Sequence, residues 1–209
     1  MADEEFYSDT LERLEKAEQL KLEGLHAEAL MILEDLLLED PENISALEEI
    51  ADNELSLGRY HRAEVASQQA VDLDGSSYTG LYILGFLRSR SEQWDEAISF
   101  LRTANGLKPN NAEILRCLGW ALFNGGERAQ GIVTLERALN LDRDSTLTLC
   151  DLGVAYLQMQ NFPKARVLFE RALELEPENP RAKECLQIVD RLKKVLKEEQ
   201  QQERMEMSL

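Results

Sequence analysis

The chain has 209 residues, of which 44% are hydrophobic, enough to form a folded core. Its 40 Asp and Glu residues against 23 Lys and Arg residues give a formal net charge of −17, which argues against nucleic acid or anionic lipid as a partner, because both attract positive charge. No apolar run approaches the roughly 18 residues of a membrane helix, and the acidic N-terminus has no apolar signal region. We therefore expect a cytoplasmic protein without membrane insertion, and three cysteines without a disulfide framework fit a reducing compartment.

The acidity is concentrated near the N-terminus. Residues 1–77 hold 21 Asp and Glu against 5 Lys and Arg, a net charge of −16, whereas the rest of the chain is nearly balanced. Residues 1–9, MADEEFYSD, precede any periodic pattern, and we expect them to form a flexible acidic leader.

Residues 10–179 repeat with a period of 34 residues, which is the sequence sign of stacked supersecondary units. In the last repeat, the small or apolar positions are Leu152, Gly153, Tyr156, Ala165, Phe169, Ala172 and Pro177. One period earlier, the same offsets hold Leu118, Gly119, Leu122, Gly131, Leu135 and Ala138. The period predicts five repeats, at residues 10–43, 44–77, 78–111, 112–145 and 146–179.

Each repeat ends on a residue that favours a helix N-cap, where its side chain accepts a hydrogen bond from a first-turn amide. These residues are Asn43, Ser77, Asn111, Ser145 and Asn179. We therefore expect two helices, A and B, in each repeat. Three glycines share one offset in the turn between them, where a positive φ costs a glycine little: Gly24, Gly58 and Gly126. Small residues share another offset, where helices A and B should approach most closely: Ala29, Ala63, Ala97, Gly131 and Ala165.

The pattern L-G-x-x-Y, followed by A-x-x-x-F-x-x-A and then P, resembles the tetratricopeptide repeat. This resemblance implies an all-α fold, a right-handed superhelical solenoid of helix–turn–helix repeats whose A helices line a concave groove. Residues 180–199, which carry an apolar stripe at helical spacing, are predicted to form a C-terminal capping helix. Residues 200–209 are predicted to be a frayed polar tail.

Two charged residues stand where the repeat usually has a large apolar residue, Glu54 in the second repeat and Arg88 in the third. They could pair with each other, or both could extend to solvent, which we favour. The three cysteines, Cys117, Cys150 and Cys185, should lie on successive A helices. Because no fourth ligand accompanies them, we interpret them as buried or groove-lining residues and not as a metal site.

No catalytic motif is present, and the two histidines, His26 and His61, lie 35 residues apart, at neighbouring offsets near the turn between helices. We interpret both as turn packing. The sequence therefore predicts a non-enzymatic protein without a cofactor or a metal.

The resemblance places a set of A-helix residues in the groove. Its acidic N-terminal end is predicted to contain Glu48, Glu49 and Asp52. The middle is predicted to be aromatic and to contain Tyr82, Phe86, Trp120 and Phe123 beside Arg90 and Arg116, with Val154 and Leu157 beyond them. Such a cluster has the composition of a binding hot spot, although some rings could instead pack between neighbouring A helices.

These features predict a protein–protein interaction module, a scaffold or adaptor that binds a peptide or helix carrying basic and apolar residues. One alternative is a secretion or assembly chaperone that shields an apolar client segment. Another is a structural component that self-associates, although we favour a monomer.

Overall fold

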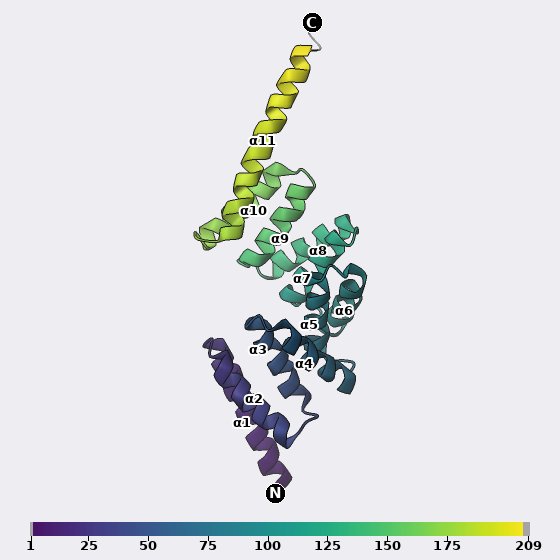
Figure 1. The fold of residues 1–209 in the computed structure, drawn as a ribbon, viewed down its shortest axis with the longest axis vertical. Helices are drawn as coiled ribbons and strands as arrows, with labels where there is room; N and C mark the ends of the chain where they lie inside the picture. Colours follow the sequence, from purple (N-terminus) through teal and green to yellow (C-terminus); the bar gives the residue numbers. More distant parts are fainter. Residues whose placement is uncertain (1, 207–209) are drawn as a thin grey trace. The chain divides into compact units, whose positions relative to one another are not determined.

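Eleven α-helices and no strand make up the part of the chain that the computed structural model describes, residues 2–206, with side chains for residues 9–195 and 198. The helices fall into two compact units, Met1–Pro109 and Asn110–Leu209, called here unit 1 and unit 2. Figure 1 labels the helices in order, and the all-α prediction is confirmed.

Unit 1 contains three helical hairpins. Their helices are α1 (Ala2–Leu22), α2 (His26–Glu39), α3 (Ile44–Ser56), α4 (Tyr60–Leu73), α5 (Tyr78–Arg90) and α6 (Trp94–Leu107). The A helices α1, α3 and α5 contact one another in order, and the B helices α2 and α4 each pack on the A helix that follows. Successive A helices therefore form a continuous layer within the unit.

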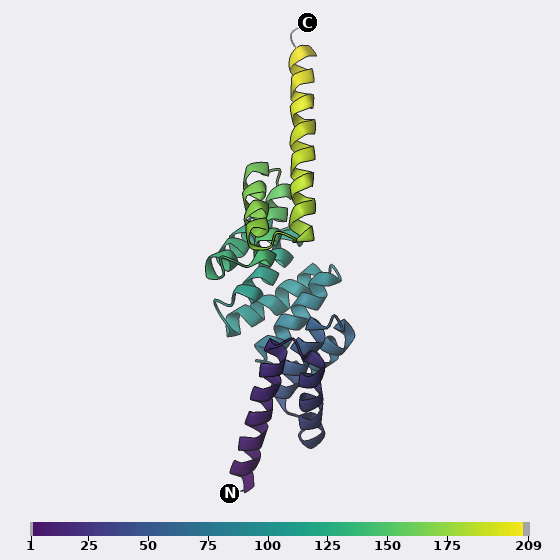
Figure 2. The ribbon, with the colours of Figure 1, turned by 90° about the vertical axis from the view of Figure 1, so that its left-hand side faces the viewer.

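Unit 2 contains two hairpins and a long final helix. Its helices are α7 (Ala112–Asn124), α8 (Arg128–Leu141), α9 (Thr146–Gln158), α10 (Phe162–Leu175) and α11 (Pro180–Glu206). The layer of A helices runs from α7 through α9 to α11, which also packs on α10. Both views show α11 projecting beyond the hairpin of α9 and α10 (Figures 1 and 2). Each helix in the described part of the chain is too short or too polar to span a bilayer.

All five predicted N-caps are confirmed. The side chains of Asn43, Ser77, Asn111 and Ser145 accept hydrogen bonds from amides three residues later, at 3.0 to 3.3 Å. Asn179 accepts from the Ala182 amide at 3.0 Å. The helices α3, α5, α7 and α9 accordingly begin at the residue after each cap, because the cap satisfies an amide that has no partner within the helix.

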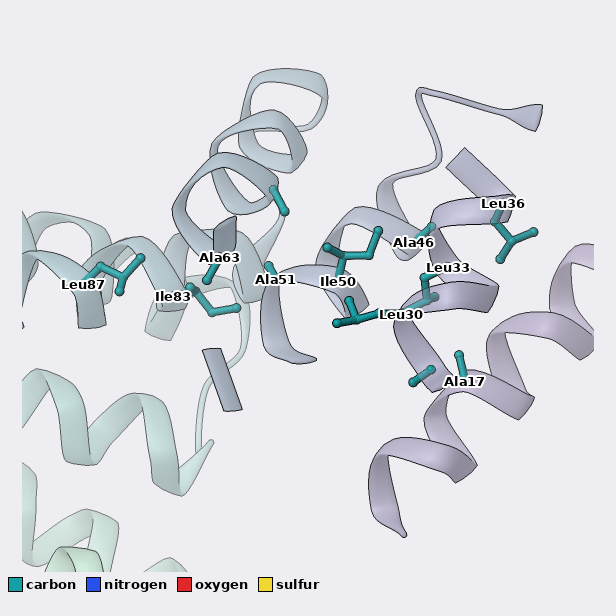
Figure 3. Packing of buried hydrophobic residues seen from close by; sticks show 12 residues of the cluster. Ala17, Leu30, Leu33, Leu36, Ala46, Ile50, Ala51, Ala63, Ile83 and Leu87 are labelled. Carbon is teal, nitrogen blue, oxygen red and sulfur yellow. The ribbon is translucent and has the colours of Figure 1, made fainter. Parts of the chain in front are cut away.

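The predicted close approach of helices A and B is also observed. Ala29, Ala63, Ala97, Gly131 and Ala165 are all buried. A Cβ on Gly131 would lie 2.6 Å from the backbone nitrogen of Phe123, so only glycine fits between α7 and α8. Figure 3 shows how Ala63 and Ala51 pack beside Ile50 and Ile83 in the core of unit 1.

The turn between A and B requires the left-handed backbone region at one position. Gly24, Gly58 and Gly126 have φ of 77°, 71° and 101° there. In the third and fifth repeats, the same offset is occupied by Glu92 and Gln160, with φ of 58° and 57°. These two residues adopt a conformation that L-residues disfavour.

The ends of the chain differ from the prediction. Helix α1 begins at Ala2, so residues that we expected to form a flexible leader are helical. Helix α11 continues to Glu206 and does not end at residue 199, because Glu, Gln, Lys and Arg all propagate a helix well. The remainder of the expected tail, residues 207–209, lies outside the described residues.

Candidate functional site

The A-helix face of unit 1 carries the predicted acidic residues, but a lysine neutralises two of them. Lys21 Nζ on α1 lies 2.7 Å from Glu49 and 3.0 Å from Asp52 on α3. Burial lowers the pKa of Lys21, but its hydrogen bonds to Glu49 and Asp52 outweigh this effect and leave the pKa raised. The lysine therefore stays charged and ties α1 to α3. The sequence contained one signal for this pairing: Lys21 lies on the A-helix face of the first repeat, next to Glu49 and Asp52 on the same face of the second.

Glu48, the third predicted acidic residue, supports the next repeat. Its Oε1 accepts a hydrogen bond from the Ser77 hydroxyl at 2.6 Å, and Ser77 is the N-cap of α5. Among the residues whose side chains the structure describes, Glu15 and Glu18 on α1 are exposed carboxylates of this face.

The aromatic residues of unit 1 are half-buried. Tyr82 and Phe86 pack against the buried cluster of the unit and are only partly exposed. The alternative that these rings pack against neighbouring helices is therefore partly correct for both. Arg90 is exposed, and its guanidinium carbon lies 4.0 Å from the ring centroid of Tyr60.

In unit 2, Phe123 is not available to a ligand. It is 1% exposed and belongs to the hydrophobic cluster of α7 to α11, which corrects its predicted place in the groove. The physical reason is Gly131, whose missing side chain lets α8 approach the backbone of α7 at Phe123 and cover that residue.

Arg116 is held in a buried ion-pair network. Its side chain is 11% exposed, its Nη1 lies 2.7 Å from Asp151 Oδ2, and its Nε donates to Glu113 at 2.9 Å. Burial lowers the pKa of Arg116, but the hydrogen bond to Glu113 and the nearby Asp151 carboxylate outweigh this effect. The pKa is raised overall, so the guanidinium stays charged. Arg116 therefore has a structural role and is not a free cation for a ligand.

Asp151 extends this network to the last helix. Its side chain is 4% exposed, and Oδ1 lies 2.7 Å from Arg181 on α11. The sequence prediction did not include this pairing. Its only signal was the spacing of Arg116, Asp151 and Arg181 at close to one repeat.

Trp120, Val154 and Ile188 form an apolar row on unit 2. They are 34 residues apart on α7, α9 and α11, of which α9 contacts both of the others; Trp120 and Val154 are half-buried and Ile188 is 36% exposed. The Arg181 guanidinium carbon lies 5.6 Å from the ring centroid of Trp120. The predicted residue Leu157 is half-buried against the cluster of unit 2, as is Val154.

Glu54 and Arg88 correct both sequence interpretations. Glu54 is fully buried and lies 2.9 Å from Arg62 and 3.4 Å from Arg59, so it neither reaches solvent nor pairs with Arg88. Arg88 instead pairs with Glu64 at 2.7 Å and Glu96 at 3.1 Å. Glu54–Arg62 and Arg88–Glu96 occupy the same two offsets of their repeats with the charges exchanged.

The thiols and imidazoles are dispersed. Cys117 and Cys150 are buried and Cys185 is half-buried, all three as free thiols. Burial raises the pKa of the Cys150 thiol to about 11, which disfavours a reactive thiolate. His26 Nδ1 lies 2.9 Å from the buried Asn53 side chain, and His61 is exposed. No group of three or more His, Cys, Asp or Glu side chains among the described residues could hold a metal ion.

Comparison with known proteins gives one family match. The model of the tetratricopeptide repeat matches residues 147–179. The human protein O-mannosyl-transferase TMTC1 is 26% identical, over 93% of this chain and 23% of its own length. The chain therefore spans about a quarter of the length of this curated relative.

Solved structures agree in fold. A tetratricopeptide-repeat protein of Thermus thermophilus, TTC0263, has a TM-score of 0.66 at 24% identity, covering 86% of this chain and 97% of that one. YrrB, described as a TPR protein with an unusual peptide-binding site, has a TM-score of 0.60 at 22% identity, covering 87% of this chain and 93% of that one. The repeated caps, the helical hairpins, the matched repeat at residues 147–179 and these likenesses show that the chain has the fold of tetratricopeptide-repeat proteins, a fold that in general supports protein–protein interaction.

Proposed function

We propose that this chain is a scaffold that binds a peptide or helix of another protein on the A-helix faces of its two units. The observation that carries the proposal is the row of Trp120, Val154 and Ile188 on unit 2. Leu192 on α11 and Leu147 on α9 are 42% and 54% exposed on the same helices. Apolar groups that line up on three adjacent helices offer anchoring positions for a partner, and Trp is among the residues most often found at hot spots.

The charge of unit 1 suggests a second property of the ligand. Residues 1–109 hold 24 Asp and Glu against 9 Lys and Arg, a net charge of −15. Unit 2 has 16 against 14. We propose that the ligand carries a Lys/Arg-rich stretch for the face of unit 1, where Glu15 and Glu18 are exposed, and apolar anchors for the face of unit 2.

The described peptide-binding site of YrrB supports the same class of function, as an analogy of fold. A chaperone that shields an apolar client segment would use the same row on unit 2. Free cysteines fit a cytoplasmic site of action, which remains part of the proposal. We propose a monomer, and size measurement over a range of concentrations tests it against self-association.

Peptide titration tests the proposal. A labelled peptide with a Lys/Arg stretch and Leu/Phe anchors is titrated with the full chain, next to an isomer in which Glu replaces the basic residues. We expect binding of the basic peptide that weakens with salt, and about thirtyfold weaker binding after Trp120→Ala, from the loss of a hot-spot side chain worth about 2 kcal/mol. Val133→Ala is the matched control, because Val133 is 58% exposed but lies on the B helix α8.

Charge reversal separates the two halves of the proposal. Glu15→Lys combined with Glu18→Lys should weaken binding of the basic peptide and reduce the salt dependence of that binding. Circular dichroism of each variant confirms the helical content. Equal binding of the acidic peptide, or an unchanged affinity after Trp120→Ala, contradicts the proposed faces.

A further inference from the structure

A second surface lies on the B helices of unit 2, away from the row of Trp120. It is a groove of about 540 Å³ between α8 and α10, with α9 below it. Its apolar lining comprises Leu139, Leu152, Pro163, Val167 and Leu168. Val167 is 64% exposed, so the groove presents an open aliphatic surface. We call it the α8–α10 groove.

A polar triad borders the α8–α10 groove. The Tyr156 hydroxyl donates to Glu136 Oε1 at 2.5 Å and accepts from Lys164 Nζ at 3.0 Å. The ammonium also lies 4.5 Å from the Tyr156 ring centroid. Among the described residues, no carboxylate lies within ion-pair distance of Lys164, and Glu136 acts on it electrostatically at longer range. The remaining hydrogen-bond donors of the ammonium can bind an anion.

Unit 1 has a counterpart of this groove three repeats earlier, between α2 and α4. Its volume is about 310 Å³, and it is lined by Glu34, Arg62 and Val65 where the α8–α10 groove has Glu136, Lys164 and Val167. Arg62 lies 2.5 Å from Glu34 and 2.9 Å from Glu54, so the cation at this offset binds carboxylates from α2 and α3. In unit 2, Tyr156 replaces the carboxylate of Glu54, and Lys164 Nζ donates a hydrogen bond to the phenol.

We propose that the α8–α10 groove binds an amphipathic helix of a partner protein, with aliphatic residues one turn apart and an Asp or Glu that pairs with Lys164. A groove between two helices fits a third helix, whose side chains at i, i+3 or i+4 and i+7 can enter it together. The carboxylate follows from charge complementarity with Lys164, because Glu136, at the offset of Glu34, binds the Tyr156 hydroxyl and does not lie within ion-pair distance of Lys164. This surface is separate from the A-helix faces, so the chain can hold two partners.

A displayed library of helical peptides, randomised along one face, provides the probe. Peptides are selected on the full chain and then titrated against variants. Val167→Glu should weaken the selected peptides at least about tenfold, because it places a charge on the aliphatic wall. Lys164→Glu should weaken them about fivefold, and Lys164→Arg should preserve binding. The matched control is Val65→Glu, at the same offset in unit 1, which should change nothing.

The outcomes are distinct. Selected peptides should carry Leu, Ile or Phe one turn apart with an acidic residue, and Trp120→Ala should leave their affinity unchanged. Selection of no peptide, peptides without an acidic preference, or peptides indifferent to Val167→Glu overturn the inference. If the wild-type chain is a dimer that Val167→Glu converts to a monomer, the occupant is a second copy and the partner helix is wrong. Loss of binding with Trp120→Ala alone would assign the peptides to the A-helix face.

Discussion

Units 1 and 2 share one repeat pattern, but each buries a carboxylate in a different place. In unit 1, Glu54 sits at an offset that holds Leu20 and Leu122 in the first and fourth repeats, and the arginines that pair with it, Arg59 and Arg62, come from α4 and the turn before it. Their side chains are 50% and 53% exposed. In unit 2, Asp151 lies in the A-helix layer between Arg116, which is 11% exposed, and Arg181, which is 41% exposed.

The positions of Glu54 and Asp151 determine which helices their ion pairs connect. The ion pairs of Glu54 stay within the hairpin of α3 and α4, whereas those of Asp151 join α7, α9 and α11. The A-helix layer of unit 1 is joined by Lys21 with Glu49 and Asp52, which are more exposed. The A-helix layer of unit 2 thus pairs Arg116 with Asp151 in its interior, whereas α1 in the A-helix layer of unit 1 exposes the carboxylates of Glu15 and Glu18.

The largest effect is expected for Asp151→Ala. The substitution leaves the buried Arg116 with one carboxylate, Glu113, in place of two and removes the ion pair of Arg181, so we expect a loss of about 3 kcal/mol in the free energy of unfolding. Urea denaturation followed by circular dichroism measures it, and hydrogen exchange should show the loss in α7, α9 and α11.

A surface pair serves as the control for Asp151. Asp190 pairs with Arg166, but its side chain is 58% exposed, and Asp190→Ala should cost less than about 1 kcal/mol. Equal losses for both variants would mean that burial of the Asp151 network contributes nothing.

Glu54 should behave in the opposite way when it is replaced by an apolar residue. The fourth repeat has Leu122 at this offset, fully buried, so Leu fits the site and Glu54→Leu should be neutral or stabilising. Arg62→Ala alone should cost about 2 kcal/mol, because it leaves the buried carboxylate with Arg59 only. In the Glu54→Leu background, the same substitution should cost almost nothing. A double-mutant cycle in urea measures this coupling, and additive effects would exclude it.

The sequence predicted the elements that depend on neighbours in the chain. The caps at Asn43 and Asn111 and the small residues at Ala63 and Gly131 were recognisable because each acts on its own helix or on the partner helix of its hairpin. The order of the repeats and the start of each internal A helix follow from them.

The candidate site was less predictable, because it depends on contacts between repeats. The period placed Phe123 on the A-helix face but did not reveal that α8 covers it. It also placed Lys21 and Asp151 on this face but did not decide which charged residues of neighbouring helices they would pair with, because several candidates share that face. The burial of Glu54 was not predicted, because a lone carboxylate is expected to extend to solvent. Its burial depends on the ion pairs with Arg59 and Arg62, which the repeat pattern does not show.

The smallest effect concerns the backbone and should be equal in the two units. Glu92 in unit 1 and Gln160 in unit 2 have φ of 58° and 57° at the offset where other repeats have glycine. The left-handed region costs an L-residue about 1 to 2 kcal/mol. Glycine avoids this cost, but its greater conformational entropy in the unfolded state offsets part of the gain in stability. Both side chains are exposed, so Glu92→Gly and Gln160→Gly remove little packing, and each should stabilise its unit by about 1 kcal/mol.

Gly58→Ala, with φ of 71°, is the reverse control and should destabilise by a similar amount. Thermal and urea unfolding of the three variants would show a shift of one sign for the first two and of the other sign for the third. If Glu92→Gly stabilises and Gln160→Gly does not, side-chain contacts in that repeat outweigh the backbone, and the two units differ in their turns as well as in their buried charges.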